Sequence, residues 1–202
     1  EDYIKNGHGL NDKRMLDLYV HNVGSMIDWA TTDGGMQLNT KAGFTNEAEH
    51  SKPRVMRWVD GAQGATRNFK ASVEKSGAKV MLGTPVEEIT LNNGAVTGVK
   101  AKGNDGVLYT IKAPAVILTT GGFGANKDML SGNLRNALYY GVKSSNGDGH
   151  RMAMKIGAKT QMMDLGKIYP NGMEVAPGIA KSTIWSNKAA FEDNSGIMGN
   201  RA

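Results

Sequence analysis

Two stretches of the sequence combine residue types that are suited to holding a ligand. In the first, AVILTTGGFGANKDML at residues 115–130, an apolar run stops at Thr119, Thr120, Gly121 and Gly122. Adjacent glycines after a strand let the backbone approach a ligand closely, because no Cβ stands in the way. Such a loop also exposes backbone N–H groups to a phosphate or a flat cofactor. The alternative is a tight strand-to-loop turn without a ligand, and spacing alone leaves both readings open.

The second stretch, SSNGDGHRMAMKIG at residues 144–157, places Asp148 between two glycines at the start of a predicted helix. An aspartate there stabilises the helix N-terminus by capping and by its charge. Alternatively, its carboxylate accepts hydrogen bonds from ligand hydroxyls. His150 follows the turn and lies either near a ligand or on the surface.

Several kinds of chemistry are excluded by composition and spacing. The chain has no cysteine, which removes disulfides, thiolate catalysis, iron–sulfur clusters and thiolate zinc sites. Its four histidines show no H-x-x-x-H spacing, so we expect no metal site. The G-x-S-x-G elbow, the Walker loop and the G-x-G-x-x-G dinucleotide fingerprint are all missing from the sequence.

The charge balance favours small anionic ligands over nucleic acids. The formal net charge is +5 and the sequence pI is about 9.3. The lysines and arginines are scattered and form no basic run, which argues against nucleic-acid binding. No apolar run approaches the ~20 residues of a membrane span. Nothing in the sequence assigns a cellular compartment.

Hydrophobic periodicity predicts helices in the first part of the chain. Asn11 and Asp12 are typical of a helix N-cap, and apolar residues then recur at helical spacing up to Gly34. Residues 36–53 are polar without a clear period and predict a long loop. A second helix is predicted over residues 60–77, with Gly77 at its C-terminus.

Strand signals dominate from residue 78 onward. AKVMLGT (78–84) predicts a short strand, and VEEITLNNGAVTGVKAKG predicts a hairpin that turns at Asn93 and Gly94. VLYTIKA (107–113) returns after a turn, and APAVILTT (113–120) is typical of a fully buried strand. A helix is predicted over residues 148–157, and the sequence shows no strong hydrophobic period after Lys159.

The order and spacing of these segments resemble the flavoprotein subunit family of fumarate reductase and succinate dehydrogenase. Soluble fumarate reductases, urocanate reductases and ketosteroid dehydrogenases belong to that wider group. The resemblance is carried by AVILTTGGFGANKDML and NGDGHRMAMKIGAK. NGHGLNDKRMLDLYVHNVGSMIDWA, PRVMRWVDGAQGA and GAKVMLGTPVEEITLNNGAVTGVKAKG also match the family's pattern, so the resemblance covers nearly the whole chain.

The resemblance implies a fold and a cofactor. The expected class is α/β (an α+β mix): a partial FAD-binding domain of the fumarate reductase type with a β-hairpin sheet, plus the start of the capping domain. Residues 1–158 would be the C-terminal portion of the FAD-binding domain, without the G-x-G-x-x-G unit. Residues 159–202 would begin the capping, or substrate, domain.

Carried over by motif, the resemblance also implies a set of FAD-binding residues. The expected set is Thr84, Pro85, Val86, Thr120, Gly121, Gly122 and Asp148. Val86 would carry the backbone contact with the adenine, with Thr84 and Pro85 beside it, and the T-G-G loop would lie on the adenosine and pyrophosphate side. Asp148 would contact the cofactor. No metal is implied.

Departures from the family pattern bear on activity. The chain ends at GIMGNRA, before the arginine that donates the proton in fumarate reductases, so we expect the catalytic acid outside this chain. Tyr169, in KIYP, stands where fumarate reductases have a substrate-binding histidine. We therefore expect an internal piece of an FAD-dependent reductase of fumarate or a related enoate. The isolated chain should bind FAD weakly or not at all.

The same reading implies an anionic small-molecule substrate and a possible electron-donor protein or domain. The alternative is a stand-alone binding module that reuses the fold without redox activity. A covalently attached FMN is disfavoured, because the only suggestive residues, Gly64, Ala65 and Thr66, lie at the start of a predicted helix.

Overall fold

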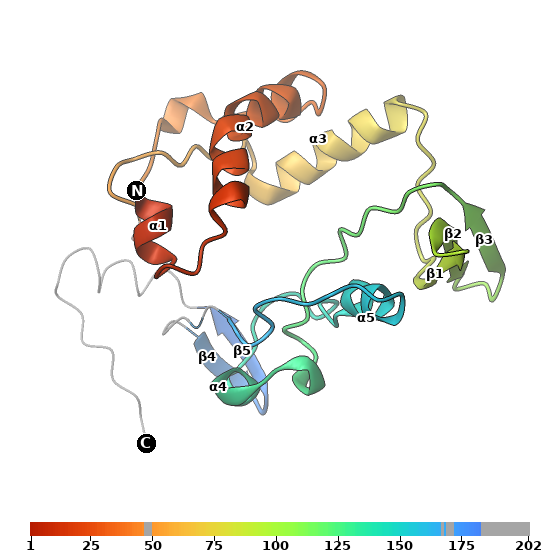
Figure 1. Ribbon diagram of the computed structural model, residues 1–202. Coiled ribbons are helices and arrows are strands. Elements are labelled where there is room, and N and C mark those ends of the chain that lie inside the picture. Colours follow the sequence, from red (N-terminus) through yellow and green to blue (C-terminus); the bar gives the residue numbers. More distant parts are fainter. Residues whose placement is uncertain (47–49, 167, 169–171, 183–202) are drawn as a thin grey trace. The chain divides into compact units, whose positions relative to one another are not determined.

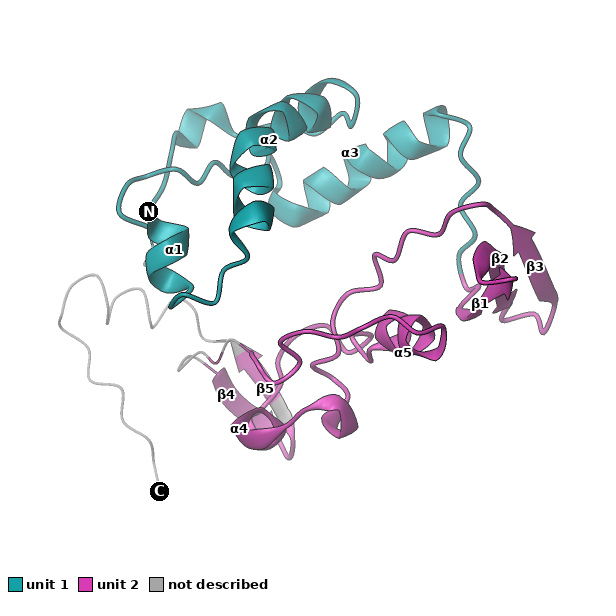
Figure 2. Cartoon of the chain, in the orientation of Figure 1, with its two compact units in different colours: residues 1–82 teal, residues 83–202 magenta. Residues whose placement is uncertain are grey.

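The computed structural model describes residues 1–46, 50–166, 168 and 172–182. The chain divides into two compact units, residues 1–82 and 83–202, coloured separately in Figure 2. This division falls within the part that we expected to be one FAD-binding portion. The boundary expected between residues 158 and 159 stays a prediction.

The first unit is helical. It contains α1 (Asp2–Asn6), α2 (Lys13–Thr32), the short η1 (Thr40–Ala42) and α3 (Gly61–Lys75), as Figure 1 shows. The predicted N-cap of α2 is confirmed, because the Asp12 carboxylate accepts a hydrogen bond from the Met15 amide at 3.0 Å. Trp29 on α2 meets Phe69 on α3 edge to face, with ring centroids 6.0 Å apart. This contact joins the two long helices.

The described part of the segment between α2 and α3 is more ordered than the predicted loop. Isolated antiparallel bridges pair Leu38 with Trp58 and Thr45 with Val55. The segment therefore doubles back on itself between the two helices. No helix among the described residues is both long enough and apolar enough to cross a membrane.

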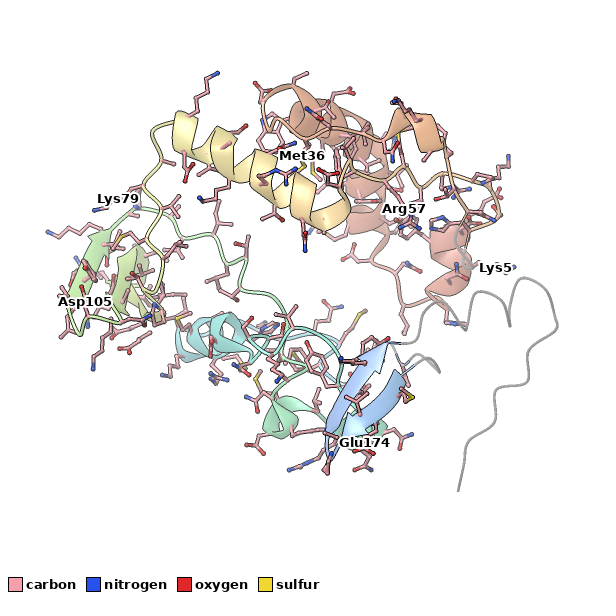
Figure 3. The ribbon with its side chains drawn as sticks, turned by 180° about the vertical axis from the view of Figure 1, so that it is seen from behind. Lys5, Met36, Arg57, Lys79, Asp105 and Glu174 are labelled. Carbon is pink, nitrogen blue, oxygen red and sulfur yellow. The ribbon has the colours of Figure 1, made fainter. Side chains whose placement is uncertain are left out.

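The second unit contains the predicted hairpin and its return strand. β1 (Val86–Asn92), β2 (Ala95–Lys102) and β3 (Leu108–Lys112) form an antiparallel sheet in the order β1-β2-β3. Asn93 and Gly94 both have positive φ, at 50° and 81°, as a two-residue hairpin turn requires. Figure 3 shows Asp105 in the turn between β2 and β3, where its carboxylate accepts a hydrogen bond from the Val107 amide at 3.0 Å.

Short helices and a second hairpin complete this unit. They are η2 (Lys127–Met129), α4 (Gly132–Asn136), α5 (Asp148–Lys155), β4 (Gly172–Ala176) and β5 (Ile179–Ser182). α5 packs against β1, and Met152 and Ile89 are among the few buried apolar side chains. Together these elements confirm the mixed α/β class with small antiparallel sheets.

Two predicted strands do not form. Residues 78–84 and 113–120 lie outside every strand of the described chain, and the side chain of Ile117 is 87% exposed. A strand is stable only when a neighbouring strand takes its backbone hydrogen bonds. No described segment supplies that neighbour here. The apolar pattern therefore indicates what these segments could do in a sheet, while in the described chain they form no strand.

Candidate functional site

The T-G-G loop and the turn before α5 are hydrogen-bonded to each other. The Gly147 amide donates to the Gly122 carbonyl at 3.1 Å, and the Ala125 amide donates to the Ser145 carbonyl at 3.0 Å. The Asn126 side chain adds a hydrogen bond to the Asn146 carbonyl at 3.1 Å. Two segments that are about two dozen residues apart in the sequence thus form one structural element.

Glycines at the start of α5 are required by this packing. A Cβ on Gly149 would overlap the side chain of Thr120, and one on Gly147 would overlap Phe123 and Met129. Gly147 also has a φ of 77°, which favours glycine. The fold therefore brings the predicted residue Thr120 directly against the first turn of α5.

The two glycines of the T-G-G loop differ in what surrounds them. Gly121 has a φ of 74°, and a Cβ added to it would lie 3.5 Å from the Ser145 hydroxyl. A Cβ added to Gly122 would meet no protein atom within 4 Å, and its φ is not in the left-handed region. Protein packing and backbone conformation therefore do not demand glycine at position 122. The open space beside it suits a flat ligand that approaches the backbone.

The carboxylate of Asp148 does not cap its own helix. The N-cap of α5 is Gly147, and no side chain makes a capping hydrogen bond there. Instead, Asp148 Oδ1 is paired with the guanidinium of Arg151, and both side chains are about half exposed. The capping hydrogen bond is thus absent, although Asp148 lies in the first turn of α5, where its negative charge is favourable; a contact with a ligand stays a prediction.

His150 is half buried beside the loop. Its ring meets Phe123 edge to face with centroids 5.1 Å apart, and its Nδ1 is buried without a hydrogen-bond partner among the described residues. The purely surface location is therefore excluded. Tyr139 supports the loop from another side, because its ring packs on Gly124 and Gly141.

Thr84, Pro85 and Val86 lead into the sheet of the same unit. The Pro85 carbonyl accepts a hydrogen bond from the Lys102 amide at 3.1 Å, and Val86 is opposite Ala101 in the ladder. α5 both begins at Asp148 and packs against β1. All seven residues expected to bind FAD thus belong to the second unit.

Arg151 and Asn146 were missed by the sequence reasoning. The signal for Arg151 was available, since an acidic and a basic residue three positions apart meet on one helix face. Asn146 contributes through its backbone carbonyl, which no side-chain pattern reveals. Tyr169 and the GIMGNRA segment lie outside the described residues.

Other candidate chemistry is limited in the described chain. Thr66 lies inside α3, where its hydroxyl donates to the Ala62 carbonyl at 2.8 Å. The described residues contain no cluster of three or more His, Asp or Glu side chains that could hold a metal ion.

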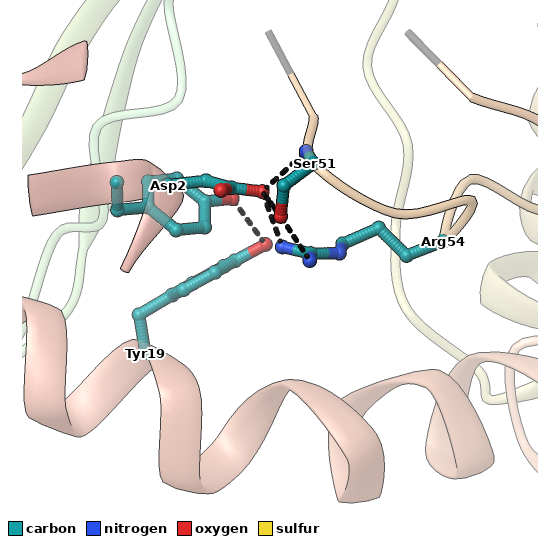
Figure 4. A network of polar contacts seen from close by, with 5 residues as sticks. Asp2, Tyr19, Ser51 and Arg54 are labelled. Atoms are coloured by element: carbon teal, nitrogen blue, oxygen red, sulfur yellow. Dashed lines mark hydrogen bonds and ion pairs between the residues drawn. The ribbon is translucent and has the colours of Figure 1, made fainter. Parts of the chain in front are cut away.

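A network of polar contacts stabilises the structure of the first unit (Figure 4). The Asp2 carboxylate accepts hydrogen bonds from the Ser51 amide (2.9 Å) and hydroxyl (3.1 Å) and pairs with Arg54 at 2.9 Å. These contacts, the Ser51 amide first, lower the pKa of Asp2. The Tyr3 hydroxyl donates to that of Tyr19 at 3.3 Å, which raises the pKa of Tyr3. The network fastens α1 to the segment that begins at Ser51.

Sequence comparison decides the family. The FAD binding domain family matches residues 1–186. The chain belongs to this family. FAD is accordingly the cofactor of the protein that contains this domain, and the loop and turn described above lie within the matched region.

Relatives of this FAD binding domain include several reductases. The chain is 27% identical over its full length to the NADH:fumarate oxidoreductase of Klebsiella pneumoniae and covers 21% of that protein. It is 24% identical to fumarate reductase 1 of Saccharomyces cerevisiae, over 98% of this chain and 44% of the relative. A urocanate reductase of Eggerthella lenta is 28% identical over 84% of this chain and 29% of its own length. The chain thus spans less than half the length of these relatives.

Solved structures share the fold. The open conformation of a flavocytochrome c3 fumarate reductase matches 78% of this chain and 28% of its own, with a TM-score of 0.71 and 23% identity. Sdh1 of Mycobacterium smegmatis in complex with UQ1 matches 77% of this chain and 27% of its own, with a TM-score of 0.60 and 23% identity. At this identity the likeness concerns the fold alone.

Proposed function

We propose that this FAD binding domain chain supplies the adenosine side of the FAD site in a flavin-dependent reductase. The observation that carries the proposal is the open space beside Gly122, where neither packing nor φ calls for glycine. A loop held by hydrogen bonds on one side and bare of Cβ atoms on the other is suited to a flat, anionic dinucleotide.

Each expected residue has a role in this proposal. Backbone groups of Thr84, Pro85 and Val86 lie against the adenine, and Thr120 with the glycines of the loop approaches the adenosine and pyrophosphate. Asp148 accepts hydrogen bonds from cofactor hydroxyls through Oδ2, since Arg151 pairs with Oδ1. The formal net charge of +5 favours the binding of an anionic ligand.

The proposed reaction of the whole protein is the reduction of an activated C=C bond in fumarate or a related enoate. Bound FAD in its reduced form would supply the hydride and become oxidised, and a protein acid would supply the proton, while the protein provides position and charge. The relatives are named for the reduction of fumarate and of urocanate, and these names support this substrate class. An electron-donor protein or domain belongs to the same proposal.

The test uses the two halves of FAD as separate ligands. Calorimetric titration of the chain with AMP and, separately, with FMN distinguishes the adenosine side from the flavin side. We expect weak binding of AMP and FAD and none of FMN, because a partial site makes only part of the contacts that offset the cost of association. Preferential binding of FMN, or no binding of either AMP or FAD, would contradict the proposal.

The non-redox alternative is tested on a longer protein that includes this chain. With FAD bound and chemically reduced under anaerobic conditions, a reductase is reoxidised when fumarate or another enoate is added. A binding module without redox activity retains reduced flavin at the rate seen without the enoate.

A further inference from the structure

Arg151 lies one turn into α5 and reaches back to the turn that precedes the helix. One terminal nitrogen donates to the Asn146 carbonyl at 2.6 Å, and the other donates to Asp148 Oδ1. The first nitrogen also lies 3.9 Å from the sulfur of Met129. A planar guanidinium can make both hydrogen bonds at once, because its donors are fixed in a fork.

The carbonyl that Arg151 contacts is shared with the loop side of the site. Asn126, at the end of the T-G-G loop, donates its side-chain amide to the same Asn146 oxygen at 3.1 Å. The next residue, Gly147, donates its own amide to Gly122. Arg151 thus contacts Asn146, whose carbonyl also accepts the hydrogen bond from the Asn126 side chain.

We propose that Arg151 is a positioning residue, which fixes the Asp148 carboxylate and the turn at residues 144–147 in the shape that meets the T-G-G loop. The inference rests on the proposed function, because it names the residue that orients the ligand-facing carboxylate. Arg151 holds Oδ1, and Oδ2 is left for a hydroxyl of the ligand.

An isolated ion pair at a half-exposed surface would not carry this role, since such pairs contribute little. The hydrogen bond from Arg151 to the Asn146 carbonyl adds to the ion pair. A hydrogen bond with a charged donor is stronger than one with a neutral donor. The hydrogen bonds described above between the turn and the T-G-G loop have neutral donors and acceptors. Loss of the guanidinium should therefore loosen the turn more than it destabilises the unit.

The experiment measures backbone amide exchange by NMR in the ligand-free chain and in R151M, R151K and K155M. Lys155 is an exposed cation one turn further along α5, so K155M is the matched control for loss of charge. R151M should speed exchange at the Gly147 and Ala125 amides by roughly three- to tenfold, while R151K recovers part of the protection. K155M should leave both amides unchanged.

Two results would overturn the inference. One is unchanged exchange at Gly147 and Ala125 in R151M, and the other is a uniform increase throughout the second unit. If R151M does not fold, R151K provides the test. Faster exchange confined to the Gly147 and Ala125 amides then supports the inference, and wild-type exchange rates overturn it.

An AMP titration of the same samples separates this inference from the proposed function. Orientation of Asp148 predicts an AMP Kd that is weaker by roughly three- to tenfold in R151M than in K155M, with partial rescue in R151K. An AMP Kd in R151M equal to that in K155M would contradict the orientation of Asp148. If the wild-type chain does not respond to AMP, the proposed function fails, while the exchange rates still decide whether Arg151 holds the turn.

Discussion

The amide of Gly147 donates a hydrogen bond to the carbonyl of Gly122 at 3.1 Å, and this bond joins the turn before α5 to the T-G-G loop. Both residues are glycines, but for different reasons. Gly147 is constrained by its φ of 77° and by Phe123 and Met129, whereas Gly122 has open space beside it. One glycine therefore serves the fold, and the other is available to a ligand.

Substituting the glycines of the site should separate packing from binding. In Gly149→Ala the new Cβ overlaps Thr120, so the free energy of unfolding of the second unit should fall by about 1–3 kcal/mol. Gly122→Ala should leave it unchanged or raise it by up to about 1 kcal/mol. Urea unfolding followed through amide NMR signals of residues 83–166 measures both.

A second-site change provides the control for that comparison. Thr120→Ala removes the atoms that the new Cβ meets, so it should recover part of the stability lost in Gly149→Ala. Equal losses in Gly149→Ala and Gly122→Ala would show that the described packing around Gly149 is wrong.

The glycine in the middle of β2 is predicted to be indispensable to the sheet. Gly98 has a φ of 144°, and a Cβ there would overlap the carbonyl of Ile111 on β3. Gly98→Ala should therefore abolish amide protection along β2 and β3, because strain and overlap add. Gly94→Ala, in the open hairpin turn, should cost only about 1 kcal/mol. Protection that survives in Gly98→Ala would disprove the close approach of Gly98 to the Ile111 carbonyl.

The extended segment before the T-G-G loop should tolerate polar substitution in the isolated chain. Because Ile117 is 87% exposed, Ile117→Thr should change the free energy of unfolding by less than about 0.5 kcal/mol. It should also lower self-association in sedimentation velocity, since an exposed apolar segment of high β-propensity promotes pairing between chains. A loss of about 2 kcal/mol would instead mean that Ile117 is buried in a sheet.

Acid should weaken the attachment of α1 in the first unit. The amide and hydroxyl of Ser51, with Arg54, lower the folded-state pKa of Asp2 below its usual value of 3.8. The resulting stability is present above that value and is lost as the pH falls through the lowered folded-state pKa. Asp2→Asn should therefore reduce the difference in stability of residues 1–82 between about pH 6 and about pH 2. An unchanged pH dependence in Asp2→Asn would contradict this role.

Local sequence signals predicted the elements that form from near neighbours. The N-cap at Asp12 and the Asn93-Gly94 turn are confirmed, since each depends on a few adjacent residues. Residues 113–120 were predicted wrongly, because a strand also needs a partner that its own sequence does not specify.

The site was predicted in part for the same reason. The T-G-G and G-D-G motifs named the two segments, but not the hydrogen bonds between them. Arg151 acts through a backbone carbonyl at Asn146, and such contacts depend on the fold of the turn. The motifs thus named the glycines and the carboxylate, whose FAD-binding role stays a prediction, but they did not reveal the contact between Arg151 and the turn.

The most direct test of the central claim is an amide NMR titration of the chain with FAD. We expect fast-exchange shift changes at the amides of Gly121, Gly122 and Asp148, with the first unit unaffected. In Gly122→Val, whose side chain would fill the open space, these changes should be lost while the fold is retained. If saturating FAD left those amides unmoved, or if Gly122→Val bound FAD as well as the wild type, the proposed adenosine site would be wrong.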